Sequence, residues 1–148
     1  MSSSTPTLPE SRAKHMSSMT LKEAISYVDR GMARAKELGA RMSFVVVDEF
    51  GQLVQLDRMD GAPLMSPDIA EAKAVTALNF KLPTSQVAKM NRDELKAMEQ
   101  VVHFKIVALP GGLPIFDGTE LRGAIGVSGD TAQQEEIASY AISRQSPG

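Results

Sequence analysis

The amino-acid sequence predicts an α+β domain in which helices pack on an antiparallel sheet. Three observations carry this prediction. Apolar residues recur at helical spacing in residues 20–38 and 68–80 and again after Asp130, while residues 43–58 and 115–129 have the composition and turn signals of paired strands. Strands and helices do not alternate as in a parallel fold, and no internal repeat is present. The 148 residues are the length of one ordinary domain.

The first predicted helix covers residues 20–38. Thr20 and Glu23 have the spacing of a capping box, in which each side chain accepts a hydrogen bond from an unpaired N–H group, and Gly39 supplies the stop. Residues 1–19 lack the apolar core of a signal peptide. We therefore expect a disordered N-terminal extension over residues 1–19 and a single domain over residues 20–148.

A hairpin is predicted next. Residues 43–48 are apolar on both faces, which is typical of a central strand covered on both sides, and residues 52–58 return as its partner. Arg58 and Asp60 stand at the end of this hairpin, before a Gly-Ala-Pro bend. They are candidate site residues, and the alternative is a plain ion pair between them.

The central helix is predicted to open at Ser66, with the hydroxyl as N-cap and Pro67 at the first helical position. Lys73 and Thr76 lie one turn apart on the face that also carries Phe80. A cation on an otherwise apolar face is either part of a site or a side chain that reaches back to water.

Residues 82–109 predict a break, a short helix over residues 86–90, a helix capped by Asn91 and a strand-like run over residues 101–109. His103 is the only histidine inside the predicted domain. The simpler interpretation is a hydrogen-bonded histidine at a helix–strand junction, and the alternative is a ligand.

Gly111 and Gly112 lie between two prolines. They form either a tight loop entering an edge strand or a row of backbone N–H groups that faces a small anion.

The remaining pattern predicts a hairpin and a closing helix. Asp117-Gly118 suits a type I′ turn, and residues 122–129 form a strand with glycine at alternate positions, Gly126 among them. Such a strand bares one face, either for a closely packed helix or for a ligand pocket. Asp130 is predicted to cap the last helix.

Composition excludes several classes of function. The net charge of -2, with no Lys/Arg cluster, argues against nucleic acid or an anionic membrane as partner. The absence of cysteine excludes disulfides, thiolate metal sites and a cysteine nucleophile, and no apolar run is long enough for a membrane span. We expect a cytoplasmic protein.

These residues together resemble the family that includes heme-binding HbpS, the GlcG proteins and the C-terminal domain of PduO-type proteins. The matching landmarks extend over residues 20–144 and are Val46-Val47-Asp48, Gly51, Arg58-Met59-Asp60-Gly61-Ala62, Ser66, Ile69-Ala70, Lys73-Ala74, Thr76-Ala77, Phe80, Pro83-Thr84, 110–115 and 123–129.

The resemblance implies a profilin-like or PAS-like fold assembled into homo-oligomers. It implies a pocket that involves Arg58, Asp60, Lys73, Thr76 and Phe80, together with Gly111, Gly112 and Gly126. The chain departs from the family pattern twice. Gln134 stands where relatives often have an acidic residue, and few histidines are available for heme ligation.

Three functions follow. The first is a module that binds heme, another tetrapyrrole or a small organic acid, with heme as the suggested cofactor, no metal site and His103 as a weak candidate ligand for heme iron. The second is a cofactor-independent isomerase, tautomerase or lyase on a small carboxylic acid. There Lys73 or Asp60 would move a proton, Arg58 would hold the carboxylate, and the N–H groups of Gly111 and Gly112 would stabilise an enolate. The third is a purely structural oligomer.

Overall fold

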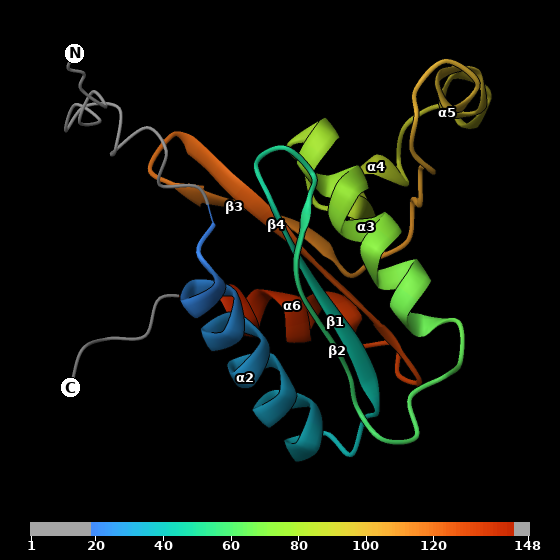
Figure 1. Cartoon of the computed structure of the whole chain (residues 1–148). Coiled ribbons are helices and arrows are strands. Elements are labelled where there is room, and N and C mark those ends of the chain that lie inside the picture. The colour runs from blue at the N-terminus through green and yellow to red at the C-terminus, as the bar shows by residue number, and fades with distance from the viewer. Residues whose placement is uncertain (1–18, 144–148) are drawn as a thin grey trace, which may run out of the picture.

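The computed structural model describes residues 19–143 (Figure 1). Four strands and five helices follow one another, and the predicted α+β architecture is confirmed. The elements are α2 (Leu21–Glu37), β1 (Met42–Asp48), β2 (Leu53–Arg58), α3 (Ser66–Phe80), α4 (Thr84–Val87), α5 (Arg92–Glu99), β3 (Gly112–Asp117), β4 (Glu120–Gly129) and α6 (Gln134–Ile142).

The strands form one antiparallel sheet in the order β2-β1-β4-β3. Helices cover both faces, with α2 and α6 on one side and α3 on the other (Figure 1). Along the central strand β1, Phe44 and Val46 pack toward α2 and α6, whereas Val45 and Val47 pack toward α3. The apolar character of this strand on both faces is therefore explained by a core on each side of the sheet.

The predicted first helix is confirmed at both ends. Thr20 and Glu23 form the capping box, and Gly39 follows the helix with a φ of 67°. Met19 is buried in the core under α2, so the domain includes this residue of the predicted N-terminal extension. The rest of that predicted extension, residues 1–18, lies outside the described residues, as do residues 144–148 of the predicted domain.

Helix α3 lies very close to the sheet because of glycine in β4. A Cβ atom on Gly126 would overlap the carbonyl oxygen of Ala70 and lie 2.8 Å from the backbone nitrogen of Ala74. Of the two predicted uses of a glycine-rich strand, the structure shows the closely packed helix.

The strand predicted over residues 101–109 is wrong. These residues form an irregular connection between α5 and β3, in which three backbone groups bond to side chains of α3 and α5 instead of to a strand. The hydroxyl of Thr76 donates to the carbonyl oxygen of Lys105 and accepts from the N–H of Val107 at 3.0 Å, and the N–H of Ile106 donates to Glu99. Of its apolar residues, Val101, Val102 and Leu109 are exposed, while Phe104, Ile106 and Val107 are partly buried.

Two predicted helix caps are also wrong. Helix α3 begins at Ser66 itself, after Met65, and the Ser66 hydroxyl bonds the Pro63 carbonyl oxygen and the buried Ser43 hydroxyl. Helix α6 begins at Gln134 with no side-chain cap, because the Asp130 carboxylate instead accepts hydrogen bonds from the backbone and guanidinium of Arg41. In both cases a tertiary partner takes the side chain that local sequence assigned to the cap.

Smaller corrections concern the turns. The short helix predicted over residues 86–90 lies earlier, as α4. In the β3–β4 hairpin Asp117 pairs with Glu120, so the loop residues are Gly118 and Thr119, and of these only Gly118 has a positive φ. A type I′ turn requires positive φ at both positions, so the predicted turn type is wrong. The capping role predicted for Asn91 is confirmed, since its side chain accepts from the N–H of Glu94.

Candidate functional site

Lys73, in the middle of α3, is a buried cation with only 1% of its surface exposed. Its ammonium donates to the carbonyl oxygen of Val127 in β4 at 3.0 Å and to the side-chain oxygen of Gln134 in α6. Within residues 19–143 no carboxylate lies within ion-pair distance of this ammonium. Lys73 therefore ties α3 to the sheet and to the last helix.

Burial of the Lys73 ammonium makes it easier to deprotonate. Burial away from water lowers the pKa of Lys73 to about 8, because the charged form loses its hydration and no negative charge replaces it. A lowered lysine pKa suits a catalytic amine. With the side chain 1% exposed, however, the amine is closed to a substrate in this conformation.

Two of the predicted glycine residues, Gly111 and Gly112, lie against Lys73. Gly111 has a φ of 128°, and a Cβ atom there would overlap the Val127 carbonyl oxygen and lie 3.0 Å from the Lys73 nitrogen. Gly112 is buried in β3, where its N–H donates to the hydroxyl of Thr84 at 2.9 Å. This N–H group is therefore already used within the protein and does not face a ligand.

Thr76 and Phe80 occupy different environments on α3. Thr76 is fully buried, and its hydroxyl holds the connection between α5 and β3 as described above. Phe80, the last residue of the helix, is half-buried and precedes Lys81, whose φ of 56° ends the helix. Neither residue joins the Lys73 hydrogen bonds.

Arg58 is the last residue of β2, and Asp60 follows it at the sheet edge beside α2. They line a cavity of about 330 Å³ together with Met32 and Lys36 of α2 and Met59. Arg58 donates to the carbonyl oxygen of Ala62 at 3.0 Å, and the ion pairs of residues 19–143 do not include an Arg58–Asp60 pair. The structure thus divides the predicted pocket, because Lys73 lies under α3 while Arg58 and Asp60 lie beside α2.

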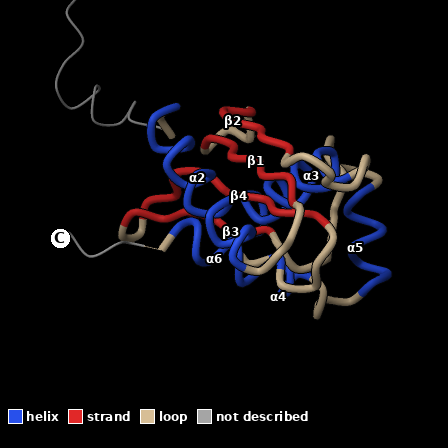
Figure 2. Tube along the Cα trace, turned by 90° about the horizontal axis from the view of Figure 1, so that it is seen from below, coloured by secondary structure: helices blue, strands red, loops and turns tan. Residues whose placement is uncertain are grey.

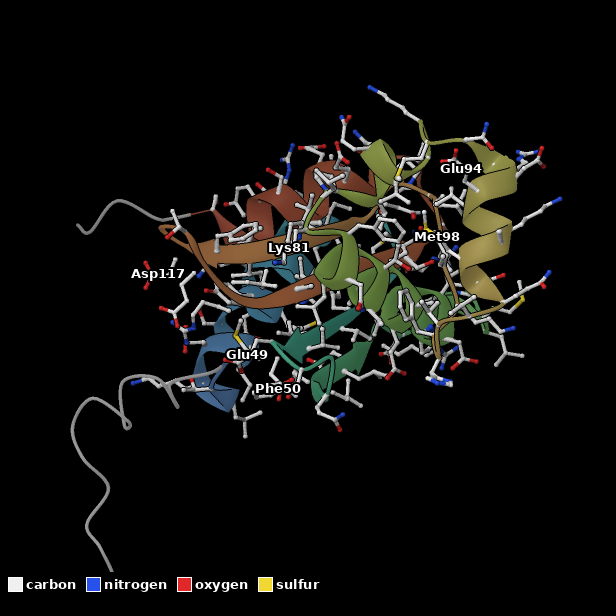
Figure 3. All side chains as sticks on the ribbon, turned by 90° about the horizontal axis from the view of Figure 1, so that it is seen from above. Glu49, Phe50, Lys81, Glu94, Met98 and Asp117 are labelled. Atoms are coloured by element: carbon white, nitrogen blue, oxygen red, sulfur yellow. The ribbon has the colours of Figure 1, made fainter. Side chains whose placement is uncertain are left out.

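His103 is exposed on the connection that follows α5. Its neighbours Val101 and Val102 are exposed as well, and Val101 keeps 77% of its surface in contact with solvent. Met98, near the end of α5, is partly exposed too and lies at the far end of the molecule in Figure 3. The histidine is therefore available to an external ligand and is surrounded in sequence by apolar side chains.

Sequence reasoning recognised Gln134 only as a departure from the family pattern, yet it is the residue that contacts Lys73. The relation joins residues 61 positions apart, so no local pattern could show it. In residues 19–143 no group of three or more His, Asp or Glu side chains is arranged to hold a metal ion, and no helix is long and apolar enough to cross a membrane.

Comparison with known proteins identifies relatives of the whole described domain. A protein of 15.0 kDa encoded between dhaT and dhaS in Citrobacter freundii is 30% identical over 128 residues, which cover 85% of this chain and 90% of that protein. A double mutant of HbpS from Streptomyces reticuli superposes with a TM-score of 0.78 at 25% identity, covering 96% of this chain and 97% of the other.

A solved heme complex, PduOC:heme, superposes with a TM-score of 0.77 at 26% identity, covering 84% of this chain and 93% of that one. The family described as haem degrading protein HbpS-like matches residues 19–143. These residues extend from the buried Met19 to just beyond α6, so the match covers every element of the fold. The chain therefore belongs to the HbpS-like family.

Proposed function

We propose that this protein binds heme or a closely related tetrapyrrole. The observation that carries the proposal is the similarity to the heme complex of PduOC over 84% of the chain at 26% identity. Membership of the HbpS-like family supports it independently of that structure.

The residues that suit an iron ligand and its surroundings lie together around the end of α5. His103 is the one histidine of residues 19–143, and its imidazole is exposed among apolar neighbours. Heme needs such a combination, because the macrocycle is apolar while its iron takes an imidazole nitrogen. Bound heme would supply redox chemistry at its iron.

Cations near the same connection offer partners for the propionate groups. Arg92 and Lys96 line a cavity of about 290 Å³ between α5 and the segment that contains Ile106 and Ala108. Guanidinium and ammonium groups bind carboxylates through charge-assisted hydrogen bonds. The proposed role of these residues is to hold the propionates while His103 ligates the iron.

The alternative of a cofactor-independent isomerase or lyase receives no support from the geometry. Of the two candidate bases, Lys73 is enclosed by α3, β4 and α6, whereas Asp60 is exposed. The Gly112 N–H that would stabilise an enolate donates to Thr84 instead. With Lys73 as the base it also needs Lys73 and Arg58 at one substrate, whereas Lys73 does not line the cavity that Arg58 lines.

Hemin titration of the full-length chain tests the proposal. We expect a saturable Soret band with the wild-type protein, a strongly altered band with His103→Ala, and an unchanged band with the matched control His15→Ala. Absence of saturable binding by the wild type would refute heme binding. An unchanged spectrum in His103→Ala would refute the assigned ligand but not the binding itself.

Assembly into a homo-oligomer stays a prediction. Native mass spectrometry of the same preparations, with and without hemin, measures the number of copies directly and shows whether heme changes it.

A further inference from the structure

A second cavity, of about 420 Å³, lies on the α2 side of the sheet and is lined by charged and apolar groups in two separate sets. Tyr27, Arg30 and Arg122 supply the donors of its polar wall, which also includes Ser143 and the carboxylates of Glu23 and Asp117. Ile115, Phe116 and Ile142 supply its apolar wall. Its size is within the range of small-molecule sites.

Arg30 is held in place but not fully used. One terminal nitrogen donates to the hydroxyl of Ser26 at 2.9 Å, and the guanidinium carbon lies 5.3 Å from the centre of the Tyr27 ring. The Nε atom, by contrast, is buried and has no hydrogen-bond acceptor among residues 19–143. Arg30 therefore has a donor that these residues do not satisfy.

The second guanidinium group in the cavity wall, that of Arg122, is held in position by the carboxylate of Glu23. Its terminal nitrogen donates to Glu23 at 2.6 Å, and the same Glu23 oxygen accepts from the backbone N–H and the hydroxyl of Thr20 in the capping box. Glu23 is therefore held at the start of α2, and it fixes the guanidinium of Arg122 at the cavity wall. Two guanidinium groups thus line one cavity, on α2 and on β4.

Tyr27 adds a neutral donor. Burial, and then the nearby charge of Glu23, raise the pKa of Tyr27, so its hydroxyl stays protonated at neutral pH. A protonated hydroxyl beside Arg30 can donate to the same anion that the guanidinium binds.

We propose that this cavity binds a small molecule with a carboxylate and a compact apolar body. Arg30 and Tyr27 donate to the carboxylate, which matches the planar fork of a guanidinium. Ile142 and Phe116, which is 44% exposed, cover the apolar body. Covering Phe116 is favourable, because it removes apolar surface from water.

The cavity is remote from the region proposed for heme. Asp117, which also lines it, lies at the tip of the β3–β4 hairpin, at the opposite end of the molecule from Glu94 and Met98 of α5 (Figure 3). The view from below agrees, since the start of α2 and α5 are at opposite ends (Figure 2). The inference therefore does not depend on heme binding.

The test uses 3-phenylpropionate as probe and its neutral amide, 3-phenylpropanamide, as the matched compound. Titration of the ¹⁵N-labelled full-length protein is expected to show saturable shifts at Tyr27, Arg30 and Phe116, with the amide binding at least about tenfold more weakly. Equal affinity for the two compounds, or no saturable shift with either, would overturn the proposal.

Variants then assign the contact. Arg30→Gln is expected to lower the affinity for 3-phenylpropionate by about tenfold or more. The weak binding of the amide is expected to stay unchanged, because only the acid loses a charge partner. Tyr27→Phe keeps the ring but removes the hydroxyl, and it is expected to lower the affinity for 3-phenylpropionate by a smaller factor. The control Lys22→Gln removes the same charge from an exposed position on α2 and is expected to bind like the wild type.

Two further results would overturn the assignment. One is Arg30→Gln binding the acid as tightly as Lys22→Gln, with both variants folded by circular dichroism. The other is displacement of the probe by one equivalent of hemin, which would place the propionates in this cavity. Because the probe titration contains no hemin, a failure of heme binding and a failure of this proposal are separate results.

Discussion

The side-chain oxygen of Gln134 accepts a hydrogen bond from the ammonium of Lys73, while the amide nitrogen of Gln134 donates to the carbonyl oxygens of Gly129 and Thr131, at 3.3 and 2.9 Å. The glutamine is thereby held in one orientation, with its oxygen toward the lysine. Lys73 is therefore bonded to a neutral amide oxygen, whereas a carboxylate at position 134 would neutralise its charge.

Stability should depend on pH through Lys73. The folded protein releases this proton near pH 8, whereas the unfolded chain keeps it up to the usual value of 10.5. Between these values the unfolded state binds more protons, so the free energy of unfolding rises with pH, by at most about 3 kcal/mol. Below pH 8 both states are protonated and the burial cost is present in full. Urea unfolding of the wild type and Lys73→Met at pH 7.5, 9 and 10 measures this.

In that experiment the difference between the two proteins isolates Lys73 from the other groups that titrate in this range. Lys89 is exposed, so Lys89→Met is the matched control. Its free energy of unfolding should change with pH as that of the wild type does. If Lys73→Met also keeps the wild-type slope, Lys73 does not have the lowered pKa.

Replacing the neutral partner with a carboxylate should reverse this behaviour. In Gln134→Glu a negative charge next to the ammonium raises the pKa of Lys73 by about 1 pH unit or more, because an opposite charge favours the charged form. Side-chain NMR titration of the lysine Cε signals measures the change. Gln133→Glu, which adds the same charge on the exposed neighbour, should leave Lys73 unchanged. Equal effects of the two variants would contradict the specific contact.

Removing the Thr76 hydroxyl should loosen the connection between α5 and β3. Thr76→Val preserves the shape of the side chain but leaves the Lys105 carbonyl and the Val107 N–H without their partner. We expect a loss of about 1–2 kcal/mol in the free energy of unfolding and faster hydrogen exchange at Val107. The isosteric change at the exposed Thr119 of the hairpin serves as control. Unchanged exchange at Val107 would show that this hydroxyl does not hold the segment.

The elements predicted correctly are those with strong local signals. The capping box of Thr20 and Glu23, the stop at Gly39 and the doubly apolar strand β1 each depend on neighbours within one element, so sequence alone shows them. The strand predicted over residues 101–109 is absent because its backbone groups at residues 105–107 bond to the side chains of Thr76 and Glu99, although its composition is apolar. Composition does not show which partners the backbone groups take.

The candidate site shows the same division. Lys73 could be recognised from sequence as a cation on an apolar helix face, and its burial shows that the side chain does not reach back to water. Arg58 and Asp60 line a cavity with residues of α2, and Lys73 is not among the residues that line it. Closeness in sequence to a helix does not determine which distant residues a side chain lies beside.

By itself the sequence determined the α+β class, the family and the positions of the main helices and strands, since hydrophobic period, turn glycines and caps act over a few residues. Only the tertiary structure decided which distant groups meet, among them Lys73 with Gln134 and Arg122 with Glu23. These contacts depend on how the elements stack across the sheet. That stacking is set by the close approach of α3 to β4 at Gly126 and by the burial of both faces of β1.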